Sequence, residues 1–297
     1  MPAISVILPV YNSESYIKEA VESILKQTFE DFEFIIMDDG STDTTCSYLK
    51  TIRDSRVTCI YNTKNSGNYK CRNIGLSQAK GKYICVMDAD DIAFPDRLEK
   101  QYYFMENNPE YAAAGSDIIC FSESNQKELI RLKNKDEIKV FLLNDNACTH
   151  PSMIIRKAIL DKYNIRYNEN FLYASDYNLM CDISHVGAIT NLNHFLLKYR
   201  SHNAQITRQK WNDQVSFRRQ IQQKQLINFQ IQPSDEEIAI HLDLMNEQCV
   251  TQERLKQMEN WCNKLLSQNE KTNYYDEEYL YRFLKERMMA VLRKSTR

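Results

Sequence analysis

Glycine and proline are scarce in this chain, with six of each among 297 residues. That composition excludes collagen and low-complexity disordered chains, and a hydrophobic content of 43% is enough for a sizeable core. No uninterrupted apolar run approaches the roughly 18 residues that span a bilayer, so any membrane association would be peripheral. Neither sign of charge is in excess, because 38 Lys and Arg face 40 Asp and Glu. The sequence therefore predicts no nucleic-acid partner.

Paired cysteines and a leader pattern are also missing. The nine cysteines form no C-x-x-C pair, and an odd count leaves at least one thiol unpaired. The chain begins Met-Pro-Ala-Ile and enters an apolar run without a positively charged segment, which is not typical of a secretory signal. We therefore expect a reducing, cytoplasmic location with mostly buried thiols.

The first hundred residues alternate short apolar runs with helical patterns. This alternation is typical of βαβ units and of a largely parallel sheet. The helical segment between the first two strands repeats apolar residues at steps of three and four from Tyr16 to Leu25, so one face should pack on the sheet. The predicted strands are Ile4–Leu8, Phe32–Met37, Val57–Tyr61 and Tyr83–Met87.

The pattern changes twice further along the chain. From Ala112 to about Arg200 the alternation is less regular, and we expect α+β elements that complete the same sheet. Beyond about residue 210 strand signals vanish and polar helical patterns dominate. We predict an α/β domain over residues 1–210 and a helical region over 211–297. The predicted helices of that region are Glu236–Cys249, Glu253–Gln268 and Asp276–Leu292.

The first acidic group, Asp38–Asp43 (DDGSTD), directly follows the predicted second strand. In a parallel α/β sheet ligands bind outside the carboxyl ends of the strands, so these carboxylates should face a crevice. A carboxylate there can accept hydrogen bonds from a uracil N–H or from ribose hydroxyls, which favours nucleotide binding. The same residues are also typical of a turn that caps a helix.

The second acidic group, Asp88–Asp91 (DADD), follows the fourth predicted strand. Three carboxylates in four residues repel one another unless a cation neutralises them. Mg²⁺ and Mn²⁺ prefer oxygen ligands and often bind one or two carboxylates together with substrate phosphates. The pattern predicts a metal-bridged diphosphate, and a solvated loop is the alternative.

Two familiar phosphate-binding loops are absent from the sequence. The first strand runs into Pro9–Asn12 (PVYN) without a glycine, which removes the G-x-G-x-x-G loop of dinucleotide oxidoreductases. No G-x-x-x-x-G-K-[ST] loop occurs either. A ligand phosphate would therefore be held by a metal, helix ends and side chains. Four of the six glycines lie in the stretch that holds the acids, where we expect them to serve backbone geometry or close ligand approach: Gly40, Gly67, Gly75 and Gly81.

Taken together, these motifs resemble glycosyltransferase family 2, whose members are inverting enzymes that use nucleotide-activated sugars. The resemblance spans about residues 3–125 and continues more loosely to about 205. It implies an α/β GT-A (Rossmann-like) fold, with a mostly parallel sheet flanked by helices and here a C-terminal helical appendage. The motifs are Val6–Asn12, Asp38–Asp43, Asn65-x-Gly67, Arg72-Asn73-x-Gly75, Gly81 and Asp88–Asp91.

The resemblance also implies a donor site. A nucleotide-binding half would lie at about residues 1–110 and an acceptor half at about 111–210. Asp90 and Asp88 would bind a divalent metal, Mn or Mg. Arg72 would either hold the nucleotide or orient the acidic loop, because a guanidinium pairs bidentately with carboxylate or phosphate. The expected nucleotide-binding residues are Pro9, Tyr11, Asp38, Asp39, Asn65, Arg72, Asp88 and Asp91.

An inverting transfer also needs a base that deprotonates the acceptor hydroxyl. Asp176 takes the position of the family's base, and Ser175 replaces the Glu that usually precedes it. The alternative is that these two residues only cap the following helix. His150 resembles a residue on the acceptor side, and Arg200 and His202 resemble an element that closes over the diphosphate.

The expected activity is metal-assisted transfer of a sugar from a nucleoside-diphosphate sugar to a hydroxyl of a glycan or lipid-linked acceptor. Only the family likeness suggests a uridine nucleotide. The basic tail over residues 285–297 could reach the inner face of a membrane, or could simply pack between helices. A nucleotidyltransferase and a non-catalytic nucleotide-sugar-binding subunit are the alternatives to the enzyme.

Overall fold

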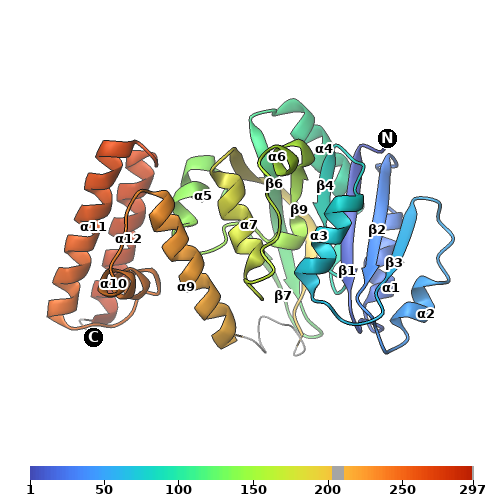
Figure 1. Ribbon diagram of the computed structural model, residues 1–297, viewed down its shortest axis with the longest axis horizontal. Helices are drawn as coiled ribbons and strands as arrows, with labels where there is room; N and C mark the ends of the chain where they lie inside the picture. Colours follow the sequence, from blue (N-terminus) through green and yellow to red (C-terminus); the bar gives the residue numbers. More distant parts are fainter. Residues whose placement is uncertain (203–210, 296–297) are drawn as a thin grey trace. The chain divides into compact units, whose positions relative to one another are not determined.

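The computed structural model describes residues 1–202 and 211–295, and these residues form two compact units (Figure 1). The first unit comprises Met1–Lys133 and Cys148–Trp211, and the second comprises Asn134–Ala147 and Asn212–Arg297. The predicted domain boundary near residue 210, and Arg297 of the basic tail, lie outside the described residues.

The first unit is built on one sheet of nine strands in the order β3-β2-β1-β4-β8-β6-β9-β5, with β7 paired to β6. Its first half is parallel, as the sequence predicts. Strand β1 is buried along its whole length, which explains its nearly continuous apolar run, because a central parallel strand is covered on both faces. The parallel strands are β1 (Ile4–Val10), β2 (Phe32–Asp38), β3 (Val57–Tyr61) and β4 (Tyr83–Val86).

The second half of the sheet is mixed. Strand β8 runs antiparallel to both of its neighbours, β4 and β6, whereas β6 and β9 are parallel with register shifts around Asp117. The short β5 pairs antiparallel with β9. The strands of this half are β5 (Ile92–Ala93), β6 (Tyr111–Phe121), β7 (Gln126–Leu129), β8 (Ile154–Arg156) and β9 (Ala188–Arg200).

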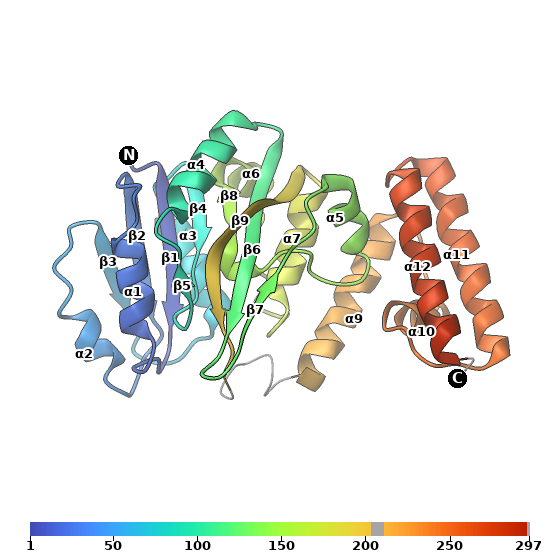
Figure 2. The ribbon, with the colours of Figure 1, turned by 180° about the vertical axis from the view of Figure 1, so that it is seen from behind.

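Helices cover both faces of this sheet. Helices α3, α6 and α7 lie on the face seen in Figure 1, and α1 and α4 lie on the face seen in Figure 2. The apolar stripe of α1 is buried against the sheet, as its periodicity predicts. The helices are α1 (Ile17–Leu25), α2 (Thr45–Leu49), α3 (Asn68–Gln78), α4 (Arg97–Asn107), α6 (Lys157–Lys162) and α7 (Ser175–Ser184).

The second unit is helical, as the sequence predicts for the C-terminal region. Its core includes Trp261 and the fully buried His241, whose Nδ1 accepts a hydrogen bond from the Trp261 indole at 3.2 Å. A capping box between Ser234 and Glu237 begins α10. The helices are α5 (Lys135–Phe141), α9 (Trp211–Asn228), α10 (Asp235–Met245), α11 (Gln252–Thr272) and α12 (Glu277–Ser295).

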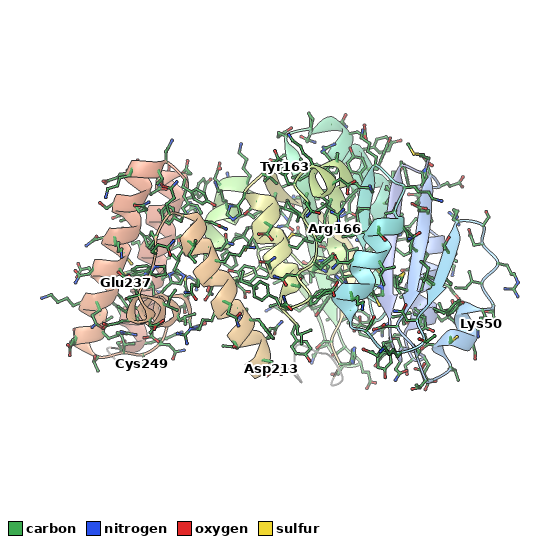
Figure 3. All side chains as sticks on the ribbon, in the orientation of Figure 1. Lys50, Tyr163, Arg166, Asp213, Glu237 and Cys249 are labelled. Atoms are coloured by element: carbon green, nitrogen blue, oxygen red, sulfur yellow. The ribbon has the colours of Figure 1, made fainter. Side chains whose placement is uncertain are left out.

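None of the nine cysteines, all of which lie in the described part of the chain, forms a disulfide, and Cys249, labelled in Figure 3, is exposed. Five of the nine are buried, in line with the expected mostly buried thiols. Among the helices of the described residues, none combines the length and the apolar character needed to cross a bilayer.

Candidate active site

The candidate site lies at the carboxyl ends of β1, β2 and β4. Val10 pairs with Asp38 at the end of β1 and β2, and Ile7 pairs with Val86 at the end of β4. The loops that follow these strands therefore begin at the same edge of the sheet, where ligands of parallel α/β sheets bind. Both predicted acidic groups lie at this edge: Asp38 is the last residue of β2, and the other acidic residues lie in these loops.

The carboxylate of Asp39 is buried and accepts hydrogen bonds from three residues of the loop before α3. The donors are the Asn62 amide at 2.8 Å, the Ser66 hydroxyl at 2.8 Å and the backbone N–H of Gly67 at 2.8 Å. Burial raises the pKa of Asp39, but these hydrogen bonds outweigh burial and hold it below its usual value. Gly67 has a φ of 98°, which L side chains rarely adopt, and this conformation starts α3 with its N–H directed at Asp39.

The first acidic loop is also tied to the end of β1. The backbone N–H of Asp39 donates to the Val10 carbonyl, and the Asn12 side chain accepts from the Thr42 N–H at 2.8 Å. Of the other predicted nucleotide-binding residues, Asp38 is buried, Tyr11 is 46% exposed beside this loop and Asn65 is exposed. Pro9 is buried within β1.

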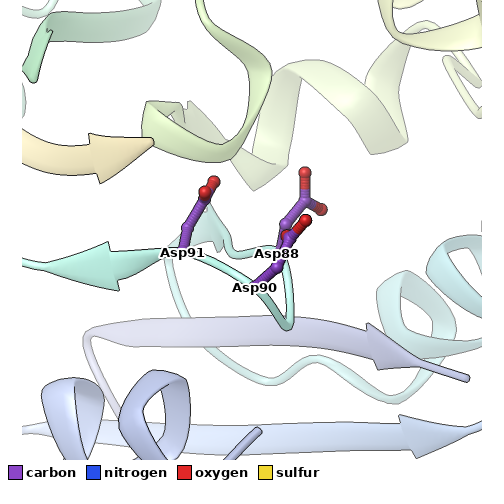
Figure 4. A group of neighbouring side chains, drawn as sticks. All are labelled: Asp88, Asp90 and Asp91. Carbon is purple, nitrogen blue, oxygen red and sulfur yellow. The ribbon is translucent and has the colours of Figure 1, made fainter. Parts of the chain in front are cut away.

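The second acidic loop gathers three carboxylates. Oxygen atoms of Asp88, Asp90 and Asp91 all lie within 4.8 Å of one another, and their side chains project from the same side of the loop (Figure 4). Burial raises the pKa of Asp91 well above its usual value, and the charges of Asp90 and Asp88 raise it further. Burial also raises the pKa of Asp88, with Arg72 opposing the shift and Asp90 and Asp176 adding to it. The positive charge near these carboxylates therefore does not balance their negative charge.

The chemistry of this group fits a hard divalent cation. One oxygen of Asp91 accepts from the backbone N–H of Arg200 at 2.9 Å, but Asp91 Oδ2 is buried and has no hydrogen-bond partner in the described part of the chain. Buried carboxylate oxygens are rarely left in that state, because the cost of desolvation is not recovered. Carboxylate oxygens are the ligands that Mg²⁺ and Mn²⁺ prefer.

The end of β9 supports this loop from the other side. The Arg200 Nε donates to the Asp90 carbonyl at 2.8 Å, and its guanidinium lies against the rings of Tyr16 and Phe121 and binds Glu19. The His202 ring lies 2.9 Å from an oxygen of Asp90. The structure thus brings both predicted residues to the second acidic loop.

Arg72 links the acidic loop to the interior. Its buried guanidinium binds Asp88 and the His150 ring, and its Nε donates to the Asn68 side chain at 2.8 Å. Burial and the charge of Arg72 lower the pKa of His150 well below its usual value, so the ring is neutral. Both ring nitrogens of His150 lie near the same Arg72 nitrogen, and Nε2 also lies 2.8 Å from the Tyr167 hydroxyl. The structure thus brings Arg72 into contact with the second acidic loop.

Asp176 lies in the first turn of α7, where the helix dipole favours a carboxylate. Its Oδ1 accepts a hydrogen bond from the Tyr69 hydroxyl at 3.2 Å. Asp176 is close enough to the second acidic loop for its charge to raise the pKa of Asp88. The neighbouring Ser175 is fully buried, and its hydroxyl has no partner among the described residues.

Comparison with known proteins assigns the family. The glycosyl transferase family 2 sequence model matches residues 5–164, more than half of the chain. The chain belongs to glycosyl transferase family 2. An uncharacterized glycosyltransferase of Haemophilus influenzae is 36% identical over 216 residues, covering 69% of this chain and 67% of that protein. Another, from Methanocaldococcus jannaschii, is 37% identical over 211 residues, covering 68% and 72%. The chain is thus a glycosyltransferase, as its motifs indicated.

Solved structures confirm the GT-A fold of this glycosyltransferase. The crystal structure of S. aureus TarS 1-349 in complex with UDP-GlcNAc has a TM-score of 0.65 at 19% identity and covers 98% of this chain and 89% of that one. The mannosyltransferase PcManGT from Pyrobaculum calidifontis, in complex with GDP-Man and Mn²⁺, has a TM-score of 0.59 at 15% identity and covers 99% and 87%.

Several residues of this site were not singled out from the sequence. Asn62 and Ser66 hold Asp39, and Asn62 directly follows β3, so its place at a carboxyl strand end was a usable signal. Tyr69 and Tyr167 contact the site from segments far apart in the sequence, and no local pattern of the glycosyltransferase indicates them.

Proposed function

We propose that this glycosyltransferase transfers a sugar from a nucleoside-diphosphate sugar, with UDP as the nucleotide, to a hydroxyl of a glycan or lipid-linked acceptor. The reaction is a single displacement that inverts the anomeric carbon. The observation that carries the proposal is the cluster of Asp88, Asp90 and Asp91, which lies within electrostatic reach of Asp176 at the carboxyl end of the sheet. The nucleotide-sugar complexes of TarS and PcManGT support the choice of donor.

The donor would bind along the first 110 residues. Tyr11 and Pro9 would flank the base, while Asp38, Asp39 and Asn65 would bind its edge. Because the protein's own donors already fix the Asp39 carboxylate, the base would meet a rigid acceptor rather than a mobile one.

Asp90 and Asp88 would hold the divalent ion, Mn²⁺ or Mg²⁺, with Asp91 beside them and the ribose near Asp88 and Asp91. When bound, the ion supplies charge stabilisation of the departing diphosphate. Arg72 fixes the direction of the Asp88 carboxylate. Arg200 and His202 hold the Asp90 backbone and side chain, and would close over the diphosphate.

The acceptor would bind along residues 111–210. Asp176 would take the proton of the attacking hydroxyl on the face of the sugar opposite the leaving diphosphate. Ser175 and His150 would line this side. Ser175 is uncharged where the family usually has Glu, so the difference should affect how the acceptor is oriented more than the proton transfer.

Release of nucleoside diphosphate from UDP-GlcNAc and other UDP-, GDP- and dTDP-sugars, with Mn²⁺ present, tests this proposal. We expect slow release with water as the acceptor for the correct donor, and at least a hundredfold lower rate for Asp176→Asn. Asp213→Asn, an exposed residue of α9, is the matched control and should keep the full rate. Donor binding without turnover for every donor would instead indicate a non-catalytic binding subunit, and full turnover by Asp176→Asn would reject its role as the base.

We also propose that α12 contacts anionic lipid at the inner face of a membrane. Tyr281 and Met289 are 54% and 44% exposed on this helix, with Lys285 and Arg293 beside them. Two further cations of the helix, Arg287 and Lys294, already bind Glu247. Co-sedimentation with phosphatidylglycerol vesicles should fall for the double variant Lys285→Glu/Arg293→Glu, and equal co-sedimentation would reject the contact.

A further inference from the structure

Tyr69 lies between the two halves of the active site, and the proposed chemistry gives its side chain no role. It lies in the first turn of α3, and its hydroxyl donates to Asp176 Oδ1 at 3.2 Å, across 107 residues of sequence. Burial raises the pKa of the Tyr69 phenol well above its usual value, and the negative charge of Asp176 raises it further. The phenol is therefore protonated and acts as a hydrogen-bond donor to the carboxylate.

We propose that Tyr69 is a positioning residue for the base. Its hydroxyl fixes the rotation of the Asp176 carboxylate and stabilises the ionised form that accepts the proton of the acceptor. The inference rests on the proposed role of Asp176. It assigns a function to a side chain that packing alone does not require, because phenylalanine would fill the same space.

The ring of Tyr69 is itself held in place. It stacks on Tyr167 with ring centroids 5.7 Å apart and planes inclined by 18°. The backbone of Tyr167 is bracketed by the side chain of Asn73, which donates to its carbonyl at 2.9 Å and accepts from its N–H at 3.0 Å. Because Asn73 and Tyr69 both lie on α3, the helix fixes one partner of the stack and anchors the other.

The same stack connects the base to the metal loop. The Tyr167 hydroxyl is hydrogen-bonded to the His150 ring, which contacts Arg72, and Arg72 binds Asp88. A chain of direct contacts therefore runs from the predicted metal ligand to the predicted base. These contacts hold Asp88, on the side of the leaving diphosphate, at a fixed distance from Asp176, on the side of the attacking hydroxyl. A single displacement requires that the attacking and leaving groups be held in this way.

The charges that face Asp176 explain why a neutral donor is useful there. Asp88 is a like charge that disfavours the ionised form of Asp176, and Arg72 is a nearby cation that favours it. Tyr167 interacts with Asp176 as a neutral phenol. The Tyr69 hydroxyl adds a hydrogen bond to the ionised carboxylate without adding a charge, which favours the ionised form.

Tyr69→Phe is the direct test, because it removes the hydroxyl and keeps the stacked ring. We expect kcat for UDP release from UDP-GlcNAc, with Mn²⁺ and water as the acceptor, to fall about tenfold with the donor KM unchanged, as one charge-assisted hydrogen bond is lost. Tyr103→Phe removes a hydroxyl from a tyrosine that is 55% exposed on α4, and this control should match the wild type.

A second measurement needs no donor at all. In protein carrying ¹³C-labelled aspartate carboxyls, the Asp176 signal is identified by its loss in Asp176→Asn, and its pKa is read from its titration. We expect this pKa to be about one unit higher in Tyr69→Phe than in the wild type. A pKa unchanged by Tyr69→Phe would overturn the proposal even if activity fell, because the hydroxyl would then not act on the carboxylate.

The outcomes separate this inference from the proposed function. If Asp176→Asn loses activity while Tyr69→Phe keeps the wild-type kcat and the wild-type pKa, Asp176 is the base and Tyr69 does not position it. If Asp176→Asn keeps full activity, the assigned base is wrong, whatever Tyr69→Phe does.

Discussion

The two acidic loops lie at the same edge of the sheet but differ in how the protein neutralises their carboxylates. In the first, the Asp39 carboxylate accepts hydrogen bonds from Asn62, Ser66 and Gly67, which together hold its pKa low. In the second, Asp88 and Asp91 have raised pKa values, and one buried oxygen of Asp91 has no partner in the described structure.

This difference separates two uses of aspartate. A carboxylate that the protein itself neutralises contributes to the rigidity of the fold and can meet a ligand without rearranging. A cluster that the protein leaves short of positive charge is destabilising until a cation joins it. The carboxylate of the first loop is thus satisfied by the protein, whereas the carboxylates of the second fit a divalent cation.

The largest effect is expected from Asp90→Ala. A metal stabilises developing charge by several kcal/mol, so turnover should fall by at least about a hundredfold at saturating Mn²⁺. Nucleoside-diphosphate release, measured over a range of Mn²⁺ concentrations, checks this. Turnover near the wild-type rate would mean that the second loop does not act through a metal.

Mn²⁺ should stabilise the protein through the second loop alone. At 100 times its dissociation constant, it should raise the free energy of unfolding by about 2.7 kcal/mol near pH 7. Thermal unfolding with and without Mn²⁺ measures this, and Asp90→Ala should abolish the effect. An equal shift in that variant would place the ion elsewhere.

The same loop sets the direction of a pH effect. Because the folded pKa values of Asp88 and Asp91 are raised, their contribution to stability is fully present below about pH 4, their unfolded pKa, and is lost as the pH rises through the folded values. The stabilisation by Mn²⁺ should therefore be smaller at pH 5 than at pH 7.5, because protons compete less with the ion at the higher pH. Equal stabilisation at both pH values would contradict the raised pKa values.

Asp39→Asn should have a smaller effect, and on stability rather than on metal binding. The amide loses the charge that strengthens the hydrogen bonds from Ser66 and Gly67, so the free energy of unfolding should fall by about 2 kcal/mol. The variant should also remove a pH dependence that is opposite in sign to that of the second loop, because the lowered pKa of Asp39 gives stability that is lost as the pH falls. Denaturant unfolding should show the loss of stability, and Mn²⁺ titration should show unchanged metal affinity.

The smallest effect is expected from Gly67→Ala. No atom lies within 4 Å of an added Cβ, so only the positive φ is unfavourable, which should cost about 1 kcal/mol of unfolding free energy. Unfolding in denaturant measures it. No loss of stability would mean that the loop before α3 adopts a different backbone.

The sequence predicts the carboxyl edge of the sheet well because the residues that indicate it are neighbours in the sequence. The strands β1 to β4 are nearly continuous apolar runs, and both acidic groups directly follow them, so their place at one edge follows from parallel topology. Helix α3 begins at Asn68, directly after Gly67 turns the chain with a positive φ.

What the sequence does not predict depends on distant contacts. The antiparallel direction of β8 and the grouping of α5 with the C-terminal helices have no local pattern. The hydrogen bond between Tyr69 and Asp176 joins residues 107 apart, and Tyr69 reads as an ordinary helical tyrosine. Likewise, nothing near His150 in sequence indicates that it would be buried against Arg72.

A crystal structure of the protein with UDP and Mn²⁺, with the anomalous signal of manganese recorded, tests the central claim most directly. We expect the manganese peak within bonding distance of an Asp90 carboxylate oxygen, bridged to the diphosphate, with Asp39 still bound to Asn62, Ser66 and Gly67. A bound UDP with the manganese away from Asp88, Asp90 and Asp91 would contradict the account.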